Sequence, residues 1–68
     1  MNEKELIEAL AEVEHKQWML WAKEVFNEVS PERQKRWESY FIEYKNLPEE
    51  VKEQDRVFAR KALEIIKK

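Results

Sequence analysis

The chain has 68 residues, of which 43% are hydrophobic and 41% are charged, and its net charge is -2 at pH 7. This length allows one domain with one core, and the absence of cysteine excludes disulfides and thiolate metal sites, so packing must stabilise the fold. The acidic balance argues against duplex DNA as a partner, and no apolar run approaches the roughly 20 residues of a membrane span. We therefore expect a soluble, cytoplasmic protein that binds neither membranes nor duplex DNA.

Strong helix formers fill three stretches of the chain, which contains no glycine and is divided by its two prolines. The first stretch predicts a long helix over about residues 3–28. Ser30 and Pro31 then fit the N-cap and first position of a second helix, where a proline loses no hydrogen bond. This helix should end before Leu47, because the residue preceding a proline is biased away from helical geometry. With a third helix over about residues 48–66, the sequence predicts a compact all-α domain of three helices with a long first helix.

Aromatic residues are numerous for so short a chain, and on the second helix they follow the spacing i, i+3, i+4 and i+7, which places them on one face. They are Trp37, Tyr40, Phe41 and Tyr44. At 100° per residue, Trp18 and Trp21 fall on a broad apolar arc of the first helix, and Phe58 falls on the apolar arc of the third. We expect Trp18, Trp37 and Phe58 to contribute to one core shared by the three helices.

Four polar residues interrupt these apolar arcs. Glu14 falls in the middle of the first arc and His15 at its edge, while Lys52 and Asp55 fall inside the arc of the third helix, three residues apart and able to pair. A polar group that is buried without a partner costs about 1 to 3 kcal/mol, so one shared network satisfies four groups more readily than four separate ones. We therefore expect these four side chains to converge between the first and third helices.

A basic ridge runs along the third helix, because Lys52, Arg56 and Arg60 follow one another at intervals of four residues. Such a ridge is commonly solvated charge whose aliphatic stems cover apolar surface. The alternative is an anion site, favoured by the nearby N-terminus of the third helix. A metal site is not expected, because a single histidine without thiolates supplies too few ligands for zinc.

Two segments of the sequence resemble the RyR domain, a small repeat first named from ryanodine receptors and also found in bacterial and phage proteins. The first is an alanine-containing helix that leads into His-x-x-Trp, present here as His15 and Trp18 within residues 10–18. The second is the run Tyr-x-x-Leu-Pro-Glu-Glu-x-Lys-x-x-Asp-Arg, which occupies residues 44–56. The Gly-Trp-x-Tyr-Gly stretch and the Pro-Tyr dipeptide of longer members are missing, with Glu43 in the place of that proline, so the chain most resembles the short phage forms.

The resemblance implies a function in binding, because prokaryotic RyR domains are similar in setting to modules proposed to sense nucleotide-derived signals in antiviral systems. A phage protein of this kind would sequester a host immune messenger. Aromatic rings would stack on a base and basic side chains would meet phosphate. The resemblance contributes five candidate ligand-binding residues, and the helical projection adds Glu14 and the two arginines of the ridge. The full set is Glu14, His15, Trp18, Tyr44, Lys52, Asp55, Arg56 and Arg60.

Two other classes of function remain open from the residues alone. The aromatic surplus would also suit a structural or protein-interaction module that forms a homo-oligomer or binds a partner protein, since exposed apolar patches usually mark contacts. Glu14, His15 and Asp55 would be the acid–base groups of a hydrolase. We do not expect an enzyme, because no nucleophile, metal-ligand set or phosphate-binding loop accompanies them, and no cofactor is implied.

Overall fold

The helices begin and end at residues whose side chains satisfy the free backbone groups there. In the computed structural model, which describes all 68 residues, helix α1 spans Glu3–Glu24 and begins where the Asn2 side chain accepts a hydrogen bond from the Glu5 amide at 2.8 Å. A short 3-10 helix, η1 (Phe26–Glu28), follows it directly. The α-helix therefore ends four residues before the predicted end.

The early end of α1 is accompanied by contacts from the Gln34 side chain of the next helix. Its amide donates to the carbonyl oxygen of Phe26 at 2.8 Å and to that of Val29 at 3.4 Å. Two carbonyl groups of the segment between α1 and α2 thereby gain partners outside any helix, which stabilises the chain where it leaves α1. The turn into the second helix is fixed by this side chain.

Helix α2 (Pro31–Glu38) starts as predicted, with the Ser30 hydroxyl accepting from the Arg33 amide at 3.3 Å and Pro31 in the first turn. Its predicted extension toward Leu47 is wrong. After Glu38 the chain turns, becomes extended at Glu43 and forms a second 3-10 helix, η2 (Tyr44–Asn46). Aromatic and β-branched residues at positions 40–42 are weak helix formers, and leaving the helix lets Tyr44 reach a buried place against α1.

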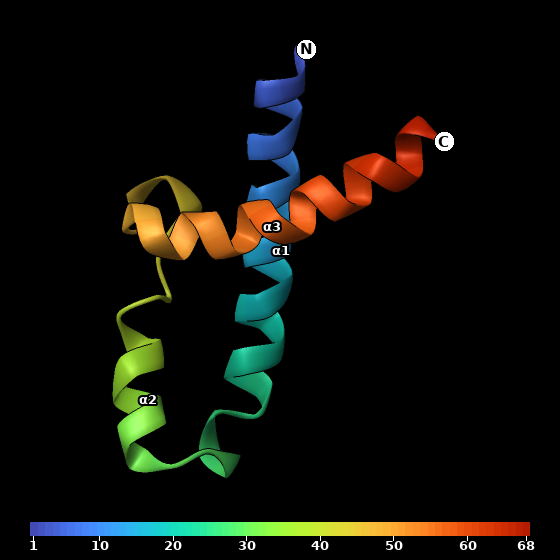
Figure 1. The fold of residues 1–68 in the computed structure, drawn as a ribbon. Coiled ribbons are helices and arrows are strands. Elements are labelled where there is room, and N and C mark those ends of the chain that lie inside the picture. Colours follow the sequence, from blue (N-terminus) through green and yellow to red (C-terminus); the bar gives the residue numbers. More distant parts are fainter.

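Helix α3 (Glu49–Lys67) begins directly after Pro48 and agrees with its predicted bounds. It crosses α1 near the middle of that helix, whereas α2 lies beside the C-terminal half of α1 (Figure 1). There are no strands, so the predicted all-α class is confirmed. The molecule measures 41 × 22 × 15 Å, and no helix has both the length and the apolar character needed to cross a bilayer.

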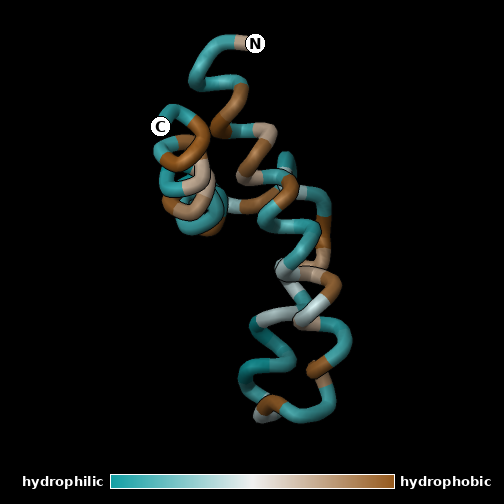
Figure 2. The backbone as a smooth tube through the Cα atoms, turned by 90° about the vertical axis from the view of Figure 1, so that its right-hand side faces the viewer, coloured by the Kyte–Doolittle hydropathy of each residue, from teal (hydrophilic) through white to brown (hydrophobic).

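Small side chains bring α1 and α3 together at the crossing. Ala11 of α1 and Ala59 of α3 are almost fully buried there, and Tyr44 and Leu47 of the η2 segment close one side of the contact. Hydrophobic and hydrophilic residues alternate along both helices, while α2 is largely hydrophilic (Figure 2). Only 7 of the 68 residues are buried, so this core is small and each of its members matters.

Phe58 does not belong to the core, contrary to prediction, and is 55% exposed. The buried side of α3 carries Asp55, Ala59 and Leu63, which recur every four residues. Phe58 precedes Ala59 and so points about 100° away from this side. The apolar arc predicted for α3 includes this contact face and its carboxylate, but it is too broad, because it extends to the exposed Phe58. Trp21 was likewise placed on an apolar arc and is 54% exposed.

Trp18 and Trp37 do meet as predicted, in an aromatic cluster that attaches α2 to α1. Their ring centroids lie 5.6 Å apart in an edge-to-face arrangement, and Trp18 also contacts the rings of Tyr40 and Phe41. The aromatic face predicted for α2 is thus real, although α2 ends before it and Tyr40 and Phe41 lie just beyond the helix.

Candidate functional site

His15 lies in the centre of the buried side of α1 and is only 2% exposed. Its Nε2 atom lies 2.7 Å from the carbonyl oxygen of Ile42, in the segment between α2 and η2. Because a carbonyl can only accept, Nε2 carries a proton and donates it. The imidazole ring also stacks on Trp18, with centroids 5.9 Å apart and planes inclined by 17°. The ring is therefore held in one orientation, with Nδ1 on the side of Asp55 of α3.

Asp55 of α3 faces this ring across the helix crossing. Its Oδ2 atom lies 3.8 Å from His15 Nδ1, too far for a hydrogen bond, and this buried oxygen has no hydrogen-bond partner. Burial raises the pKa of the Asp55 carboxyl, the neighbouring His15 opposes that shift, and the negative charge of Glu14 adds to it. The His15–Asp55 pair therefore leaves one buried oxygen of the Asp55 carboxylate without a hydrogen-bond donor.

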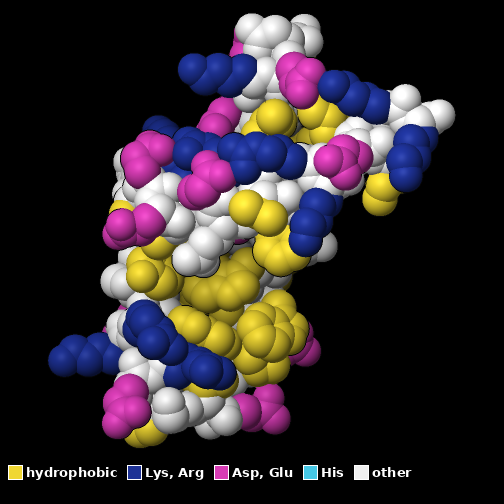
Figure 3. Space-filling view, in the orientation of Figure 1, with side chains coloured by type: hydrophobic (Ala, Val, Ile, Leu, Met, Phe, Trp, Pro, Cys, Tyr) yellow, Lys and Arg dark blue, Asp and Glu magenta, His cyan; other side chains and the backbone are white.

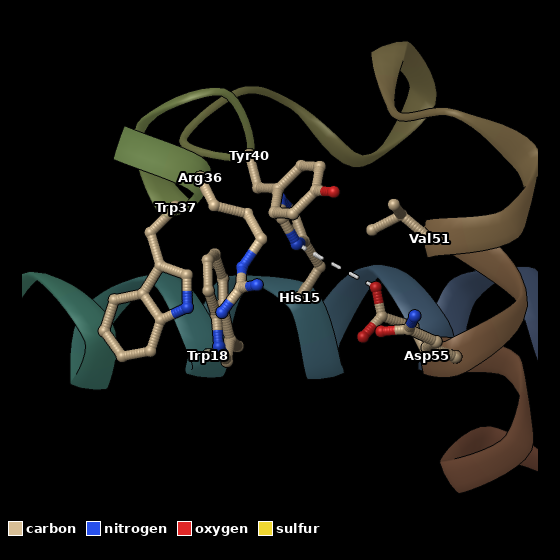
Figure 4. A pocket seen from close by; sticks show the side chains of 8 residues that line it. His15, Trp18, Arg36, Trp37, Tyr40, Val51 and Asp55 are labelled. Carbon is tan, nitrogen blue, oxygen red and sulfur yellow. Dashed lines mark ion pairs between the residues drawn. The ribbon is translucent and has the colours of Figure 1, made fainter. Parts of the chain in front are cut away.

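A pocket of about 270 Å³ opens beside this pair, and we call it the Asp55 pocket. Rings of α1 and of the α2 region form one wall, and α3 forms the other (Figure 4). Arg36 extends from α2 toward α1 near Trp18 (Figure 4). The lining residues are His15, Trp18, Arg36, Trp37, Tyr40, Val51, Gln54 and Asp55. The pocket therefore combines aromatic surface with a carboxylate, an amide and a guanidinium group.

A second group of charged residues, which we call the Glu8 cluster, joins α1 to α3 on the other side of Tyr44. The Glu8 carboxylate accepts from the Tyr44 hydroxyl at 2.8 Å and from Nε of Arg56. Arg56 also donates to Glu49 at 3.0 Å, and Lys52 lies 3.5 Å from Glu49. The cluster consists of Glu8, Tyr44, Glu49, Lys52 and Arg56. Unlike the Asp55 pocket, it pairs each cation with a carboxylate.

The pKa values of the Glu8 cluster shift as expected for such pairing. The hydrogen bond from Arg56 is the main cause that lowers the pKa of Glu8, and burial opposes it. Burial and the hydrogen bond to Glu8 raise the pKa of Tyr44 to about 12. The Glu8 and Glu49 carboxylates hold the pKa of Arg56 above its ordinary value. All three shifts favour the protonation states present at neutral pH.

The predicted site residues thus divide between two places. His15, Trp18 and Asp55 line the Asp55 pocket. Glu14 lies near enough to raise the pKa of Asp55 but does not line the pocket, and it is His15, not Glu14, that occupies the centre of the buried face. The others lie in or beside the Glu8 cluster: Tyr44, Lys52, Arg56 and Arg60.

The predicted convergence of four polar residues is therefore right for His15 and Asp55 and wrong for Lys52. Lys52 pairs with Glu49 and lies over the Tyr44 ring at 5.7 Å, and no ion pair joins it to Asp55. The basic ridge is balanced in the same way, since Arg60 donates to Glu53 at 2.6 Å. Acidic and basic side chains alternate along α3 on the surface (Figure 3). The ridge is an ion-pair network and not a free cationic surface, and of its three cations only Arg60 is exposed.

Sequence reasoning missed Glu8 and several pocket residues. Glu8 precedes His15 by seven residues, which is two helical turns, so both lie on the same side of α1. This spacing could have identified Glu8 as another polar residue facing α3. Trp37 and Tyr40 belonged to the predicted aromatic face, but the pocket beside them was not predicted. Arg36 and Gln54 had no signal, because nothing in the sequence distinguishes them from other surface polar residues.

No group of three or more histidine, aspartate or glutamate side chains is arranged to hold a metal ion. The chain was also compared with known protein families, with characterised proteins and with solved structures, and none of the three comparisons finds a match.

Proposed function

We propose that this chain is a binding module for a small nucleotide-derived ligand, which it holds in the Asp55 pocket. The observation that carries the proposal concerns Asp55, which lines a pocket walled by aromatic rings and whose buried Oδ2 atom has no hydrogen-bond partner within the protein. Buried polar atoms in folded proteins are nearly always paired, so an orphaned acceptor in a concavity is best explained by a partner that arrives with a ligand.

The lining of the pocket suits a nucleotide in three respects. Trp18, Trp37 and Tyr40 offer aromatic surface for a base, a contact worth about 1 to 3 kcal/mol per base in single-strand binding proteins. Arg36 makes no ion pair within the protein, so its guanidinium group is available for phosphate. The volume of about 270 Å³ suits one ring system with its phosphate outside, and not a dinucleotide.

The RyR resemblance supports the same proposal from a separate direction. His15 and Trp18 come from the first matched segment and Asp55 from the second, and these residues line one pocket although the segments are far apart in the sequence. In this proposal the chain acts as a short RyR-like domain, and its biological role is that of a phage protein that sequesters a host immune messenger. Binding alone is proposed, since no serine, threonine or cysteine lines the pocket to act as a nucleophile.

The test is calorimetric titration of the purified protein with a panel of mononucleotides and cyclic nucleotides. We expect at least one member to bind with a stoichiometry of one per chain. Arg36→Ala should weaken the binding of a phosphorylated ligand about tenfold. Arg33→Ala is the matched control, because Arg33 lies on the same helix, is exposed and does not line the pocket. If the wild type binds no member, or if both variants weaken binding equally, the proposal fails.

The alternative is a structural or protein-interaction module, and exposed apolar side chains favour it. Trp21 and Phe58 are both more than half exposed, and hydrophobic side chains gather below α3 (Figure 3). A homo-oligomer or a partner protein would cover such a surface. Sedimentation over a wide range of concentrations distinguishes the two functions. A dimer that Trp21→Gln or Phe58→Gln dissociates, with no nucleotide binding, would favour the interaction module.

A further inference from the structure

Two exposed aromatic residues extend the lining of the Asp55 pocket along α1 and α3, and we call the combined surface the Trp21–Phe58 face. Trp21 follows the pocket residue Trp18 by three positions, and its ring centroid lies 5.7 Å from that of Trp37. Phe58 follows Asp55 by three positions on α3. Residues three apart on a helix lie on the same side, so both side chains border the pocket. Each is more than half exposed, and hydrophobic side chains gather below α3 on this surface (Figure 3).

The chain exposes more surface than a compact monomer of its mass. Its accessible surface is 5381 Å². A folded monomer of 8.4 kDa exposes about 4600 Å² by the usual scaling of surface with mass. The excess of about 800 Å² equals the area that each partner contributes to a protein–protein interface of standard size. One such interface would therefore bring the exposed surface to the value expected for a stable fold.

The small core gives a physical reason for association. No large side chain is fully buried within the chain. Domains of fewer than about 70 to 80 residues commonly gain stability from disulfides, a structural metal or association. This chain has no cysteine and no group of metal ligands, but it does have an apolar face that association would bury.

The charges around the Trp21–Phe58 face favour a second copy of this chain as the partner. Glu14, Arg36 and Lys61 form no ion pair within the chain. Glu14 lies near Asp55, and Arg36 lines the pocket beside it. Lys61 Nζ lies 5.7 Å from the centroid of the Phe58 ring. Carboxylates and cations are thus balanced, so the face can pair its unlike charges with those of an identical face across a two-fold axis.

We infer that the Trp21–Phe58 face is the interface of a two-fold symmetric dimer of this chain. The rings of Trp21 and Phe58 form the apolar centre of the interface, and the unpaired charges form its rim. The second copy covers the mouth of the Asp55 pocket and so competes with a ligand for this face. The inference does not rest on the proposed function, because the apolar face and the excess surface do not depend on any ligand.

Sedimentation of the 68-residue chain between about 1 and 500 μM tests the inference, since weak and moderate dimers dissociate in this range. The wild type should change from a monomer of 8.4 kDa to a dimer as its concentration rises. Its melting temperature should rise over the same range, because association stabilises only the folded chain. Trp21→Gln and Phe58→Gln should each weaken the dimer at least about tenfold, as the loss of a central aromatic residue does. At concentrations where the wild type is monomeric, both variants should melt like the wild type, because both positions are exposed in the single chain.

Leu20→Gln is the matched control, because Leu20 is 68% exposed and, as the neighbour of Trp21 on α1, points about 100° away from it. It should dimerise like the wild type. A dimer that the Trp21 and Phe58 variants leave intact, or that Leu20→Gln also dissociates, uses another surface and overturns the inference. A wild type that stays monomeric at every concentration leaves the face to a different protein or to no partner, and this too overturns it. If that monomer binds a nucleotide, the proposed function still stands.

Discussion

The Glu8 cluster and the Asp55 pocket join the same two helices with ionisable side chains, yet they are built in opposite ways. In the Glu8 cluster, a carboxylate of α1 accepts from Tyr44 and from Arg56 of α3, so its charge is compensated. In the pocket, a carboxylate of α3 faces a histidine of α1 at 3.8 Å and accepts no hydrogen bond. The first arrangement favours the folded state, whereas the second costs stability that a ligand can restore.

The largest expected effect comes from Tyr44, which belongs to both the core and the Glu8 cluster and is 7% exposed. Tyr44→Ala should destabilise the protein by about 3 to 5 kcal/mol, as buried aromatic residues do when truncated. The measurement is urea unfolding followed by circular dichroism. Phe58→Ala removes an aromatic ring from the exposed face of α3 and should change stability by less than about 0.5 kcal/mol. Equal effects of the two variants would contradict the assigned core.

Glu8→Gln should have the next largest effect, because it removes the carboxylate charge and replaces one of the two oxygens that accept from Tyr44 and Arg56 with an NH₂ group. We expect a loss of about 1 kcal/mol, a charge-assisted hydrogen bond discounted for the partial exposure of Glu8. The sign of the pH dependence follows from the pKa of Glu8, which is below its ordinary 4.5 in the folded protein. The stabilisation is complete above about pH 4.5 and is lost as the pH falls through the lower folded pKa.

Thermal melts of the wild type and Glu8→Gln between pH 7 and pH 2 would check this. The two melting temperatures should approach each other as the solution becomes acidic. A constant difference across the range would show that the carboxylate charge of Glu8 does not contribute.

Asp55→Asn should act in the opposite direction and stabilise the free protein by up to about 1 kcal/mol at pH 7, because it removes a carboxylate that has a buried oxygen without a hydrogen-bond partner. The pKa of Asp55 is raised above its ordinary 3.8 in the folded protein. Its folded form therefore binds a proton more readily than the unfolded chain, and wild-type stability declines as the pH rises from 3.8 through the folded pKa. The variant should lack this decline. Marked destabilisation at pH 7 would mean that the pair is a structural ion pair.

The smallest effect is expected for Arg60→Ala. Arg60 pairs with Glu53 on the exposed side of α3, where solvent screens the charges, so the melting temperature should not change measurably. Nucleotide binding should also be unchanged, because Arg60 does not line the Asp55 pocket. Reduced nucleotide binding by this variant would show that the basic ridge takes part in ligand binding.

Sequence patterns predicted the three helices and the bounds of α3 well, since prolines and capping residues act locally. They failed where a distant partner decides the outcome. The end of α2 depends on the packing of Tyr44 against α1, where its hydroxyl donates to Glu8. The end of α1 depends on the hydrogen bond from the Gln34 side chain to the Phe26 carbonyl. The role of Lys52 likewise depended on whether Glu49 or Asp55 would be its partner. Within one apolar arc, hydropathy could not show that Asp55 and Ala59, and not Phe58, face α1.

The hydrogen bond from His15 to the Ile42 carbonyl has a consequence for local opening of the fold. Helix α2 makes its contacts with α1 through aromatic rings and long side chains, without the close backbone approach that joins α1 to α3. A region with so few buried contacts opens at a lower free energy than the whole domain. When α2 moves away from α1, the His15 ring loses the carbonyl partner that fixes its orientation, so amide exchange in α2 and rotation of the His15 ring would occur together.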